Sequence, residues 1–319
     1  MELPVVVGVD GSDTASGALD WAAGMAALRG IPLRIVHVSP RDRYEGCLPP
    51  SAADRPAERL RGETVLAMAA ERAGRGAPEL KVMTDLVTDD PVSALLRAGQ
   101  RAEAVVVGWR GRGEFASLLL GSVGRGIAAR AHCPVVVVRG RAESLAGRTR
   151  RVAVGVAERE RPGGLGSVPP PSPAVAFALR EARLRGCGLE AVHAWRCAGP
   201  DDHGPRATYA GERADRARDP ASDGHQGRAG RADHTRHAAA LLTEALGGAV
   251  GTPGTPPVPV THRTVEGPAR KALLDASARA DLLVVGARRR QGPFGMQIGP
   301  VNHAVLHHAR CPVAVVPQI

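Results

Sequence analysis

Glycines and small polar residues follow two apolar runs and form the part of the chain best suited to chemistry. Residues 8–12 read Gly-Val-Asp-Gly-Ser after a valine-rich run. Residues 108–111 read Gly-Trp-Arg-Gly after a second such run, and nine residues later Gly121 and Ser122 follow. Glycine lets the backbone bring bare N–H groups close to an anion, and a helix start adds unpaired N–H groups and the positive end of the helix dipole. The pattern predicts a phosphate chain held between the glycine-rich loop and a helix that opens at Ser122.

The individual residues have predicted contacts around such a ligand. Gly8 leaves room for a ligand against the first strand. Asp10 places a carboxylate at the mouth, which suits a ribose hydroxyl or a Mg²⁺ ion carried by the phosphates. Val38 and Val107 end two strands and are placed to sandwich a flat base. The whole predicted binding set is Gly8, Val9, Asp10, Val38, Val107, Gly108, Gly111, Arg112, Gly113, Gly121, Ser122 and Val123.

Simpler structural roles stay open for the same residues. A glycine-rich turn between a strand and a helix is often only a tight connection. Ser122 can cap the helix instead of donating to phosphate, and Asp10 and Ser12 can cap the helix that follows them. The guanidiniums of Arg110 and Arg112 either neutralise phosphates or lie on a solvated loop. The convergence of these residues on one edge of one sheet favours a ligand.

The chain repeats itself, and this repeat determines its architecture. Three segments recur: 105–108 at 283–286, 131–138 at 309–316, and 7–9 at 154–156. The first two matches share an offset of 178 residues, whereas the third has an offset of 147. The second copy therefore carries about 31 extra residues.

The repeat predicts two domains, 1–140 and 151–319, with a polar linker at 141–150. Most of the extra residues of the second domain lie in 199–237, which is rich in Asp, Arg, Gly, His and Pro and poor in large apolar residues. Such a segment buries too little surface to offset the entropy of ordering, so disorder is expected near 199–237.

Short β-branched runs alternate with helical patterns along the first domain. Ala18, Ala22 and Met25 fall on one face of a helix after the first run. Strands are expected at 5–9, 33–38, 80–87, 104–107 and 135–138, and further helices at 58–73, 92–101 and from 122 onward. This alternation predicts an α/β fold with a parallel sheet and helices on both faces, and ligands of such sheets bind beyond the carboxyl ends of the strands.

These motifs resemble the universal stress protein family, whose ATP-binding members carry G-x2-G-x9-G-[ST] after the fourth strand. Residues 108–122 match that pattern in full, and residues 7–12 and 132–135 are also similar to the family. The resemblance covers nearly the whole chain and implies two tandem open parallel five-stranded sheets in the order 3-2-1-4-5. It also implies ATP at the ends of strands one and four, and pairing of the two domains through their last strands.

The second copy departs from the motif at three positions. Arg289 stands where the first copy has Gly111, Pro300 where it has Ser122, and Ala157 where it has Asp10. Proline has neither a hydroxyl nor an N–H, and each lost contact costs about 1–3 kcal/mol. The second domain is therefore expected to keep the fold and the partner surface and to have lost its nucleotide site, although Arg289 could itself contact a phosphate.

Composition narrows the remaining classes of function. The net charge is +10, but the arginines are dispersed without interleaved aromatic residues, so nucleic-acid binding is not expected. No run reaches the ~18 apolar residues of a membrane span, and the N-terminus shows no secretory pattern. Five cysteines without CxxC spacing suggest reduced thiols. A cytoplasmic protein is expected, with Cys133 and Cys311 as packed small residues.

Several histidines offer other chemistry. His303 and His307 are spaced i, i+4 and could bind a metal, but a plain surface helix is the simpler interpretation. His37 and His193 occupy equivalent strand positions, which suggests one structural role in both copies.

The sequence as a whole favours an ATP-binding stress-response or regulatory protein whose first domain holds the nucleotide. Two alternatives stay open: an interaction scaffold without nucleotide, and a slow ATP hydrolase, for which no base that could activate water is identifiable. The partners expected are ATP and the second domain itself, with a homodimer of such chains as a further option.

Overall fold

The computed structural model describes residues 2–39, 55–111, 120–157, 171–196, 220–247, 257–288, 290–292 and 295–318. The first repeat consists, in chain order, of β1 (Val5–Val9), α1 (Asp13–Arg29), β2 (Leu33–Ser39), α2 (Arg55–Gly76), β3 (Val82–Thr88), α3 (Pro91–Gly99), β4 (Ala104–Gly108), α4 (Ser122–Arg130) and β5 (Val135–Val138). These elements lie within a few residues of the sequence expectation. One helical turn, α5 (Ala142–Leu145), occupies the expected linker.

The second repeat follows the same plan. Its elements are β6 (Arg151–Gly155), α6 (Pro173–Leu184), β7 (Gly188–Trp195), α7 (Pro220–Gly247), β8 (Val260–Glu266), α8 (Ala269–Ser277), β9 (Leu282–Arg288), β10 (Arg290–Gly292), β11 (Gly295–Gln297), α9 (Pro300–His308) and β12 (Val313–Gln318). The short strands β10 and β11 form an antiparallel hairpin with no counterpart in the described part of the first repeat.

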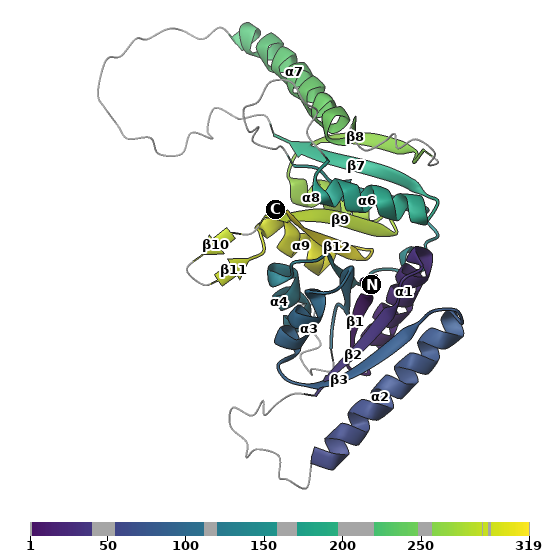
Figure 1. The fold of residues 1–319 in the computed structure, drawn as a ribbon. Coiled ribbons are helices and arrows are strands. Elements are labelled where there is room, and N and C mark those ends of the chain that lie inside the picture. The colour runs from purple at the N-terminus through teal and green to yellow at the C-terminus, as the bar shows by residue number, and fades with distance from the viewer. Residues whose placement is uncertain are drawn as a thin grey trace.

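The two repeats share one sheet, which corrects the expectation of two separate five-stranded sheets. The single sheet has ten strands in the order β3-β2-β1-β4-β5-β12-β9-β6-β7-β8 (Figure 1). Each half keeps the order 3-2-1-4-5 with parallel neighbours, and the halves join where β5 pairs antiparallel with β12. The last strands pair as expected, and their hydrogen bonding makes the two sheets continuous. This pairing also removes two strand edges that would otherwise be open.

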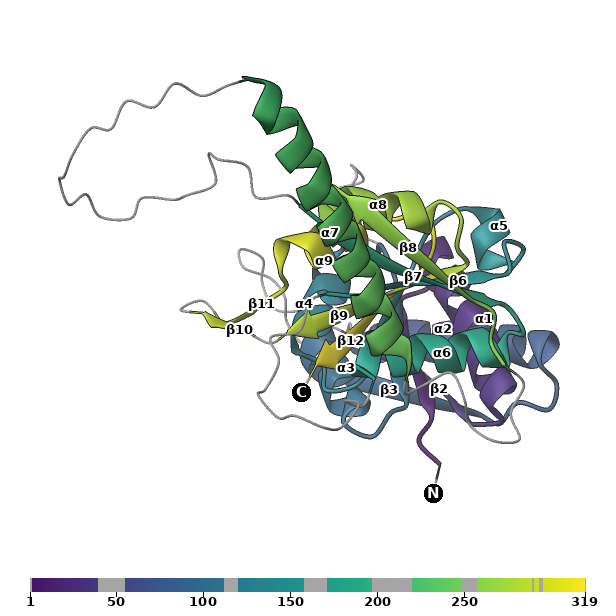
Figure 2. The same ribbon diagram turned by 90° about the horizontal axis from the view of Figure 1, so that it is seen from above.

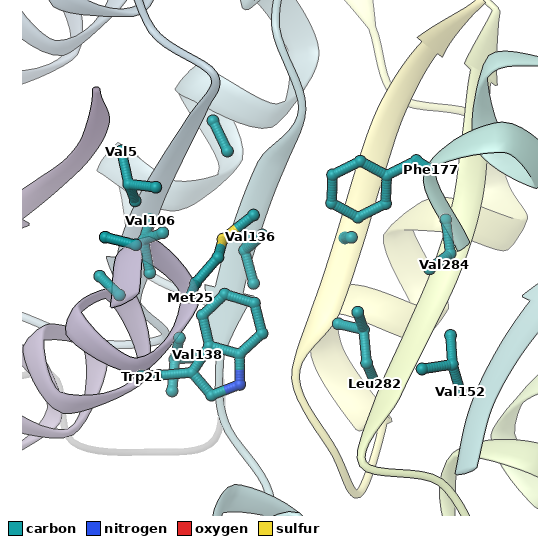
Figure 3. Packing of buried hydrophobic residues seen from close by; sticks show 14 of the residues in the cluster. Val5, Trp21, Met25, Val106, Val136, Val138, Val152, Phe177, Leu282 and Val284 are labelled. Carbon is teal, nitrogen blue, oxygen red and sulfur yellow. The ribbon is translucent and has the colours of Figure 1, made fainter. Parts of the chain in front are cut away.

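Two apolar layers cover the faces of this sheet, and each layer contains residues of both repeats. One layer packs α1, α2, α6 and α7 against the sheet, and the other packs α3, α4, α8 and α9. In the first layer Trp21 and Met25 lie over Val136, while Phe177 and Val284 occupy the other side of the strand junction (Figure 3). The repeats are therefore joined through their cores as well as through β5 and β12.

Helix α7 begins inside the segment 199–237 for which disorder is expected. Residues 220–237 are helical and continue into the half of α7 that packs beside β7 and β8 (Figure 2). Ala238, Leu242 and Leu246 are buried at a spacing of four residues and anchor that half. Once a helix is anchored, each added residue costs little, so a polar segment can extend it. The remainder of the expected segment, 199–219, lies outside the described residues.

Candidate functional site

Strands β1 and β4 bring the two sequence motifs together. They are parallel neighbours, with Val7 opposite Val106, so their carboxyl ends meet at one edge of the sheet. A Cβ added to Gly111 would lie 2.8 Å from Oδ2 of Asp10. Any side chain at position 111 would therefore collide with the carboxylate. The predicted convergence of Asp10 and Gly111 is present in the fold.

The Asp10 carboxylate is held in place by the turn that follows it. Ser12 donates to Asp10 Oδ1 from its backbone N–H at 3.0 Å and from its hydroxyl at 2.6 Å. Gly11, between them, has a φ of +81°, a conformation that favours glycine. Ser12 also caps α1 by accepting from the N–H of Ala15 at 3.2 Å. The capping role belongs to Ser12, and Asp10 is left oriented toward Gly111.

Thr14 ties the loop after β1 to the loop after β4. Its hydroxyl donates to the carbonyl of Arg110 at 2.7 Å and lies 3.1 Å from the hydroxyl of Ser12. Gly108 permits this approach, because an added Cβ would lie 2.8 Å from the carbonyl oxygen of Thr14. Gly108 is thus required by the contact between β4 and α1.

Helix α4 opens toward the same place. Its N-cap is Gly121, whose N–H donates to the carbonyl of Trp109 at 3.0 Å and which offers no side chain to the helix. Ser122 is the first helical residue and is exposed, so of its two predicted roles the cap is not observed. The first intrahelical bond runs from the N–H of Arg125 to Gly121, which leaves the N–H groups of 122–124 without intrahelical partners.

The space beside Gly8 is filled by protein, contrary to the role expected for it. A Cβ at Gly8 would lie 2.9 Å from a methyl group of Leu95 on α3. The second repeat has the same arrangement, in which Gly155 faces Leu273 at 3.0 Å. Because the contact occurs in both repeats, Gly8 serves helix packing. The sequence showed only that a side chain was missing, and the residue that fills the gap comes from another element.

The remaining predicted residues are four valines of the apolar layers and two residues outside the described ranges. Val38 and Val107 belong to the layer of α3 and α4, with Val107 buried and Val38 partly exposed. Val9 is buried in the opposite layer, and Val123 is partly buried on α4. Arg112 and Gly113 lie outside the described residues.

Trp109 lies beside the site and was not among the binding residues predicted from the sequence. The guanidinium of Arg110 stacks over its ring at 3.9 Å, and Arg139 approaches the same ring at 5.3 Å. Burial lowers the pKa of Arg139. Two cations therefore flank the loop that carries Gly111. The sequence signal for this contact was a tryptophan directly after Gly108, the first glycine of the motif.

The equivalent region of the second repeat is built differently. Strand β9 runs two residues past Gly286 and pairs with β12 as far as Arg288 and Gln318. Ala157 supplies no carboxylate, and α9 begins with Pro300, which has no N–H. The side chain of Asn302 donates to the carbonyl of Gly286 at 2.9 Å. An extended strand thus replaces the beginning of the loop that carries Gly111 in the first repeat, and Arg289 lies outside the described residues.

One side chain of the second repeat reaches the loop of the first. Nδ1 of His307 on α9 accepts from the backbone N–H of Leu120 at 3.3 Å, directly before Gly121. His307 is only 6% exposed, so the expectation of a plain surface helix is wrong at this position, although His303 and His308 are exposed. The His303 and His307 rings lie 4.2 Å apart. Within the described ranges no group of three His, Cys, Asp or Glu residues forms a metal site.

The other equivalent pairs have the structural roles expected of them. Nδ1 of His37 donates to the carbonyl of Val9 at 2.8 Å, and Nδ1 of His193 donates to that of Val156 at 2.9 Å. Cys133 and Cys311 are buried, and burial raises the pKa of Cys133 to about 11. A thiol with such a pKa is neutral at physiological pH and packs as a small apolar group.

No helix in the described part of the chain is both long and apolar enough to cross a membrane.

Comparison with known proteins agrees with the two-repeat architecture. The model of the universal stress protein family matches residues 2–139 and 164–317. A universal stress protein of Mycobacterium tuberculosis is 35% identical over 324 residues, which cover 98% of this chain and 97% of the relative. A second one from that organism is 31% identical over 318 residues, which cover 98% and 96%.

The fold is also found among solved structures. A universal stress protein from Archaeoglobus fulgidus superimposes with a TM-score of 0.65 at 16% identity, covering 99% of this chain and 98% of that one. This likeness concerns the fold alone. With the family model across both repeats and relatives that span the whole length, the chain belongs to the universal stress protein family, as a tandem two-repeat member.

Proposed function

We propose that the first repeat binds ATP and that the protein acts as a nucleotide-dependent regulatory module of the stress response. The observation that carries the proposal is the contact between Asp10 and Gly111, where the carboxylate after β1 occupies the space that a side chain at 111 would take. The complete G-x2-G-x9-G-S spacing of 108–122 supports the same assignment.

The described residues suit the parts of this ligand. The phosphates would meet the N–H groups of 122–124 and the positive end of the α4 dipole. The Ser122 hydroxyl is exposed at that helix start and can donate to a phosphate oxygen. Arg110 and Arg139 add positive charge nearby. The chemistry of this donor set fits an anion with several oxygen atoms.

Asp10 would serve the metal or the sugar. A carboxylate is the ligand that Mg²⁺ prefers, and it also accepts from a ribose hydroxyl. The two hydrogen bonds from Ser12 fix the orientation of the carboxylate before any ligand arrives, which reduces the entropic cost of binding.

The second repeat would be structural or regulatory. Ala157 and Pro300 remove a carboxylate and a backbone donor from the places where the first repeat has them. The extended β9 supports the same reading, because it leaves no loop at residues 287 and 288 to approach a phosphate. One nucleotide per chain is the stoichiometry that follows.

The test is the affinity for Mg-ATP of wild type and three variants, measured by calorimetry on the full chain. Asp10→Asn keeps the acceptor for Ser12 and removes the charge, and Gly111→Val fills the space in front of the carboxylate. Asp13→Asn removes an exposed charge of the same sign from the first turn of α1 and serves as the matched control. We expect Asp10→Asn to weaken binding about tenfold or more, Gly111→Val to abolish it and Asp13→Asn to leave it unchanged. Equal affinity in all four proteins would contradict the assignment, and no binding by wild type would favour the scaffold class.

A further inference from the structure

The loop that carries Gly111 ends at a residue held by the other repeat. Leu120 is buried, and its backbone N–H donates to Nδ1 of His307 across the boundary between the repeats. The next residue, Gly121, begins the helix whose free N–H groups face the proposed phosphate site. Helix α9, which carries His307, lies next to α4 (Figure 1). The position of the α4 start thus depends on a side chain of the second repeat.

The protonation state of this histidine follows from the contact. A nitrogen that accepts from an N–H group carries no proton of its own, so the proton of the neutral ring is on Nε2. Nε2 is buried and has no hydrogen-bond partner among the described residues. A second proton on the ring would sit on Nδ1 and point at the N–H of Leu120. The charged ring therefore cannot keep this bond.

The surroundings also oppose the charged ring. Burial lowers the pKa of His307 below the ordinary value of 6.5, and the nearby His303, His308, Arg139 and Arg125 lower it further. Within the described ranges these are the titratable groups that influence the ring, and they come from α9 itself, from the end of β5 and from α4. None of them is acidic, so nothing there compensates the added charge.

The contact exists in one direction only. The first-repeat position equivalent to His307 is Ala129, and the position equivalent to Leu120 is Ile298. An alanine cannot accept a hydrogen bond from the second repeat in return. The asymmetry favours the repeat that keeps the complete phosphate motif, although the two copies are otherwise joined symmetrically through β5 and β12.

We propose that His307 of the second repeat is a positioning residue for the nucleotide loop of the first repeat: the neutral imidazole holds Leu120 and the start of α4, and protonation releases them. This inference rests on the proposed function, because it deepens the role of the same site. It gives the second repeat a task without a nucleotide of its own. ATP binding by the first repeat becomes sensitive to acidification through a residue that touches no nucleotide.

The experiment uses the full chain and three variants of α9. His307→Asn retains an acceptor near the place of Nδ1 and does not titrate, whereas His307→Leu retains the bulk and removes the acceptor. His308→Asn changes an exposed histidine on the same helix and is the matched control. Dissociation constants for Mg-ATP are measured from pH 8 down to the lowest pH at which the protein stays folded, and the Leu120 amide resonance of the ¹⁵N-labelled protein is followed over the same range without nucleotide.

At pH 8 we expect wild type, His307→Asn and His308→Asn to bind ATP alike and His307→Leu to bind about fivefold more weakly. As the pH falls through the folded-state pKa of His307, which burial places below 6.5, wild type and His308→Asn should lose affinity relative to His307→Asn, and the Leu120 amide should shift in these two proteins only. The comparison with His307→Asn removes the titration of ATP itself from the result.

Two results would overturn the inference. A Leu120 amide that does not respond to pH in wild type or to His307→Leu at pH 8 would mean that the contact does not exist in solution. A constant affinity ratio between wild type and His307→Asn across the pH range would mean that the contact does not act on the site. If wild type binds no ATP while the amide still responds, the proposed function fails, and with it the positioning role, while the contact itself stands.

Discussion

Arg29 of α1 and Glu181 of α6 form an ion pair between the two repeats, with side chains only 6% and 1% exposed. Arg185 also contacts Glu181, at 3.0 Å, and Arg29 lies 5.9 Å from the centre of the Phe177 ring. The pair links α1, which packs against β5, to α6, which packs against β12. A buried pair in this position makes the stability of one repeat depend on the other.

Replacing Glu181 by Gln should therefore destabilise the whole chain. The substitution leaves the buried Arg29 guanidinium without its counter-ion, and breaking a buried pair in this way costs about 3–5 kcal/mol. Chemical denaturation monitored by circular dichroism measures the effect. Glu63→Gln, which removes an exposed partner of Arg59, is the control and should leave the unfolding free energy unchanged. Similar small effects of both substitutions would show that the interrepeat pair contributes little.

Gly108 should tolerate no side chain. Alanine at this position would place its Cβ 2.8 Å from a backbone oxygen of Thr14, and overpacking against backbone costs about 1–3 kcal/mol. Gly17, within α1, has nothing within 4 Å of an added Cβ, so Gly17→Ala should instead stabilise by up to about 1 kcal/mol through helix propensity. Thermal unfolding of both variants checks the opposite signs. Because Gly108 also fixes the contact between the two loops, Gly108→Ala should weaken ATP binding as well.

The stability of the fold should fall with acidification partly through His307. Burial lowers the pKa of this histidine in the folded state, so between that value and 6.5 the unfolded chain binds more protons than the folded chain. The contribution of His307 is complete above pH 6.5 and is lost as the pH falls toward its folded pKa. Unfolding free energies of wild type and His307→Asn, measured from pH 5 to 8, should diverge at the acidic end. Parallel curves would exclude this contribution.

Restoring the two missing residues of the second repeat should not create a second nucleotide site. In Ala157→Asp combined with Pro300→Ser, β9 would still run to Arg288 beside β12, and Asn302 would still bond to Gly286. The double variant should bind the same amount of ATP per chain as wild type in an equilibrium binding assay. A second equivalent of bound ATP would show that the two residues alone determine the loss of the site.

Much of the fold follows from the sequence because its signals are local and repeated. The valine runs at 5–9 and 104–107, the glycines after them and the 178-residue offset predict the strands, the site edge and the tandem plan. The shared structural role of His37 and His193 was also predictable, since the same residue recurs at the same strand position in both repeats. The strand order within each half came from the family resemblance and is confirmed.

What the sequence did not predict depends on contacts between distant elements. The role of Gly8 in packing depends on Leu95, which comes from α3. The first half of α7 is helical because Leu242 and Leu246 anchor the half that follows. The continuous sheet depends on the antiparallel register of β5 and β12, which no single repeat encodes. The sequence predicted an exposed His307, because its spacing along the helix carries no information on contacts with the other repeat. The sequence signal for this role was that position 307 holds a histidine where the equivalent position of the first repeat holds Ala129.

The central claim is that the first repeat alone holds ATP, and counting nucleotide tests it most directly. Wild type and Asp10→Asn are incubated with the same concentration of Mg-ATP, freed of excess nucleotide and denatured, and the released ATP is measured by absorbance and mass spectrometry. The account predicts one ATP per wild-type chain and a large reduction in Asp10→Asn. Two ATP per wild-type chain, or an equal amount released from both proteins, would contradict it.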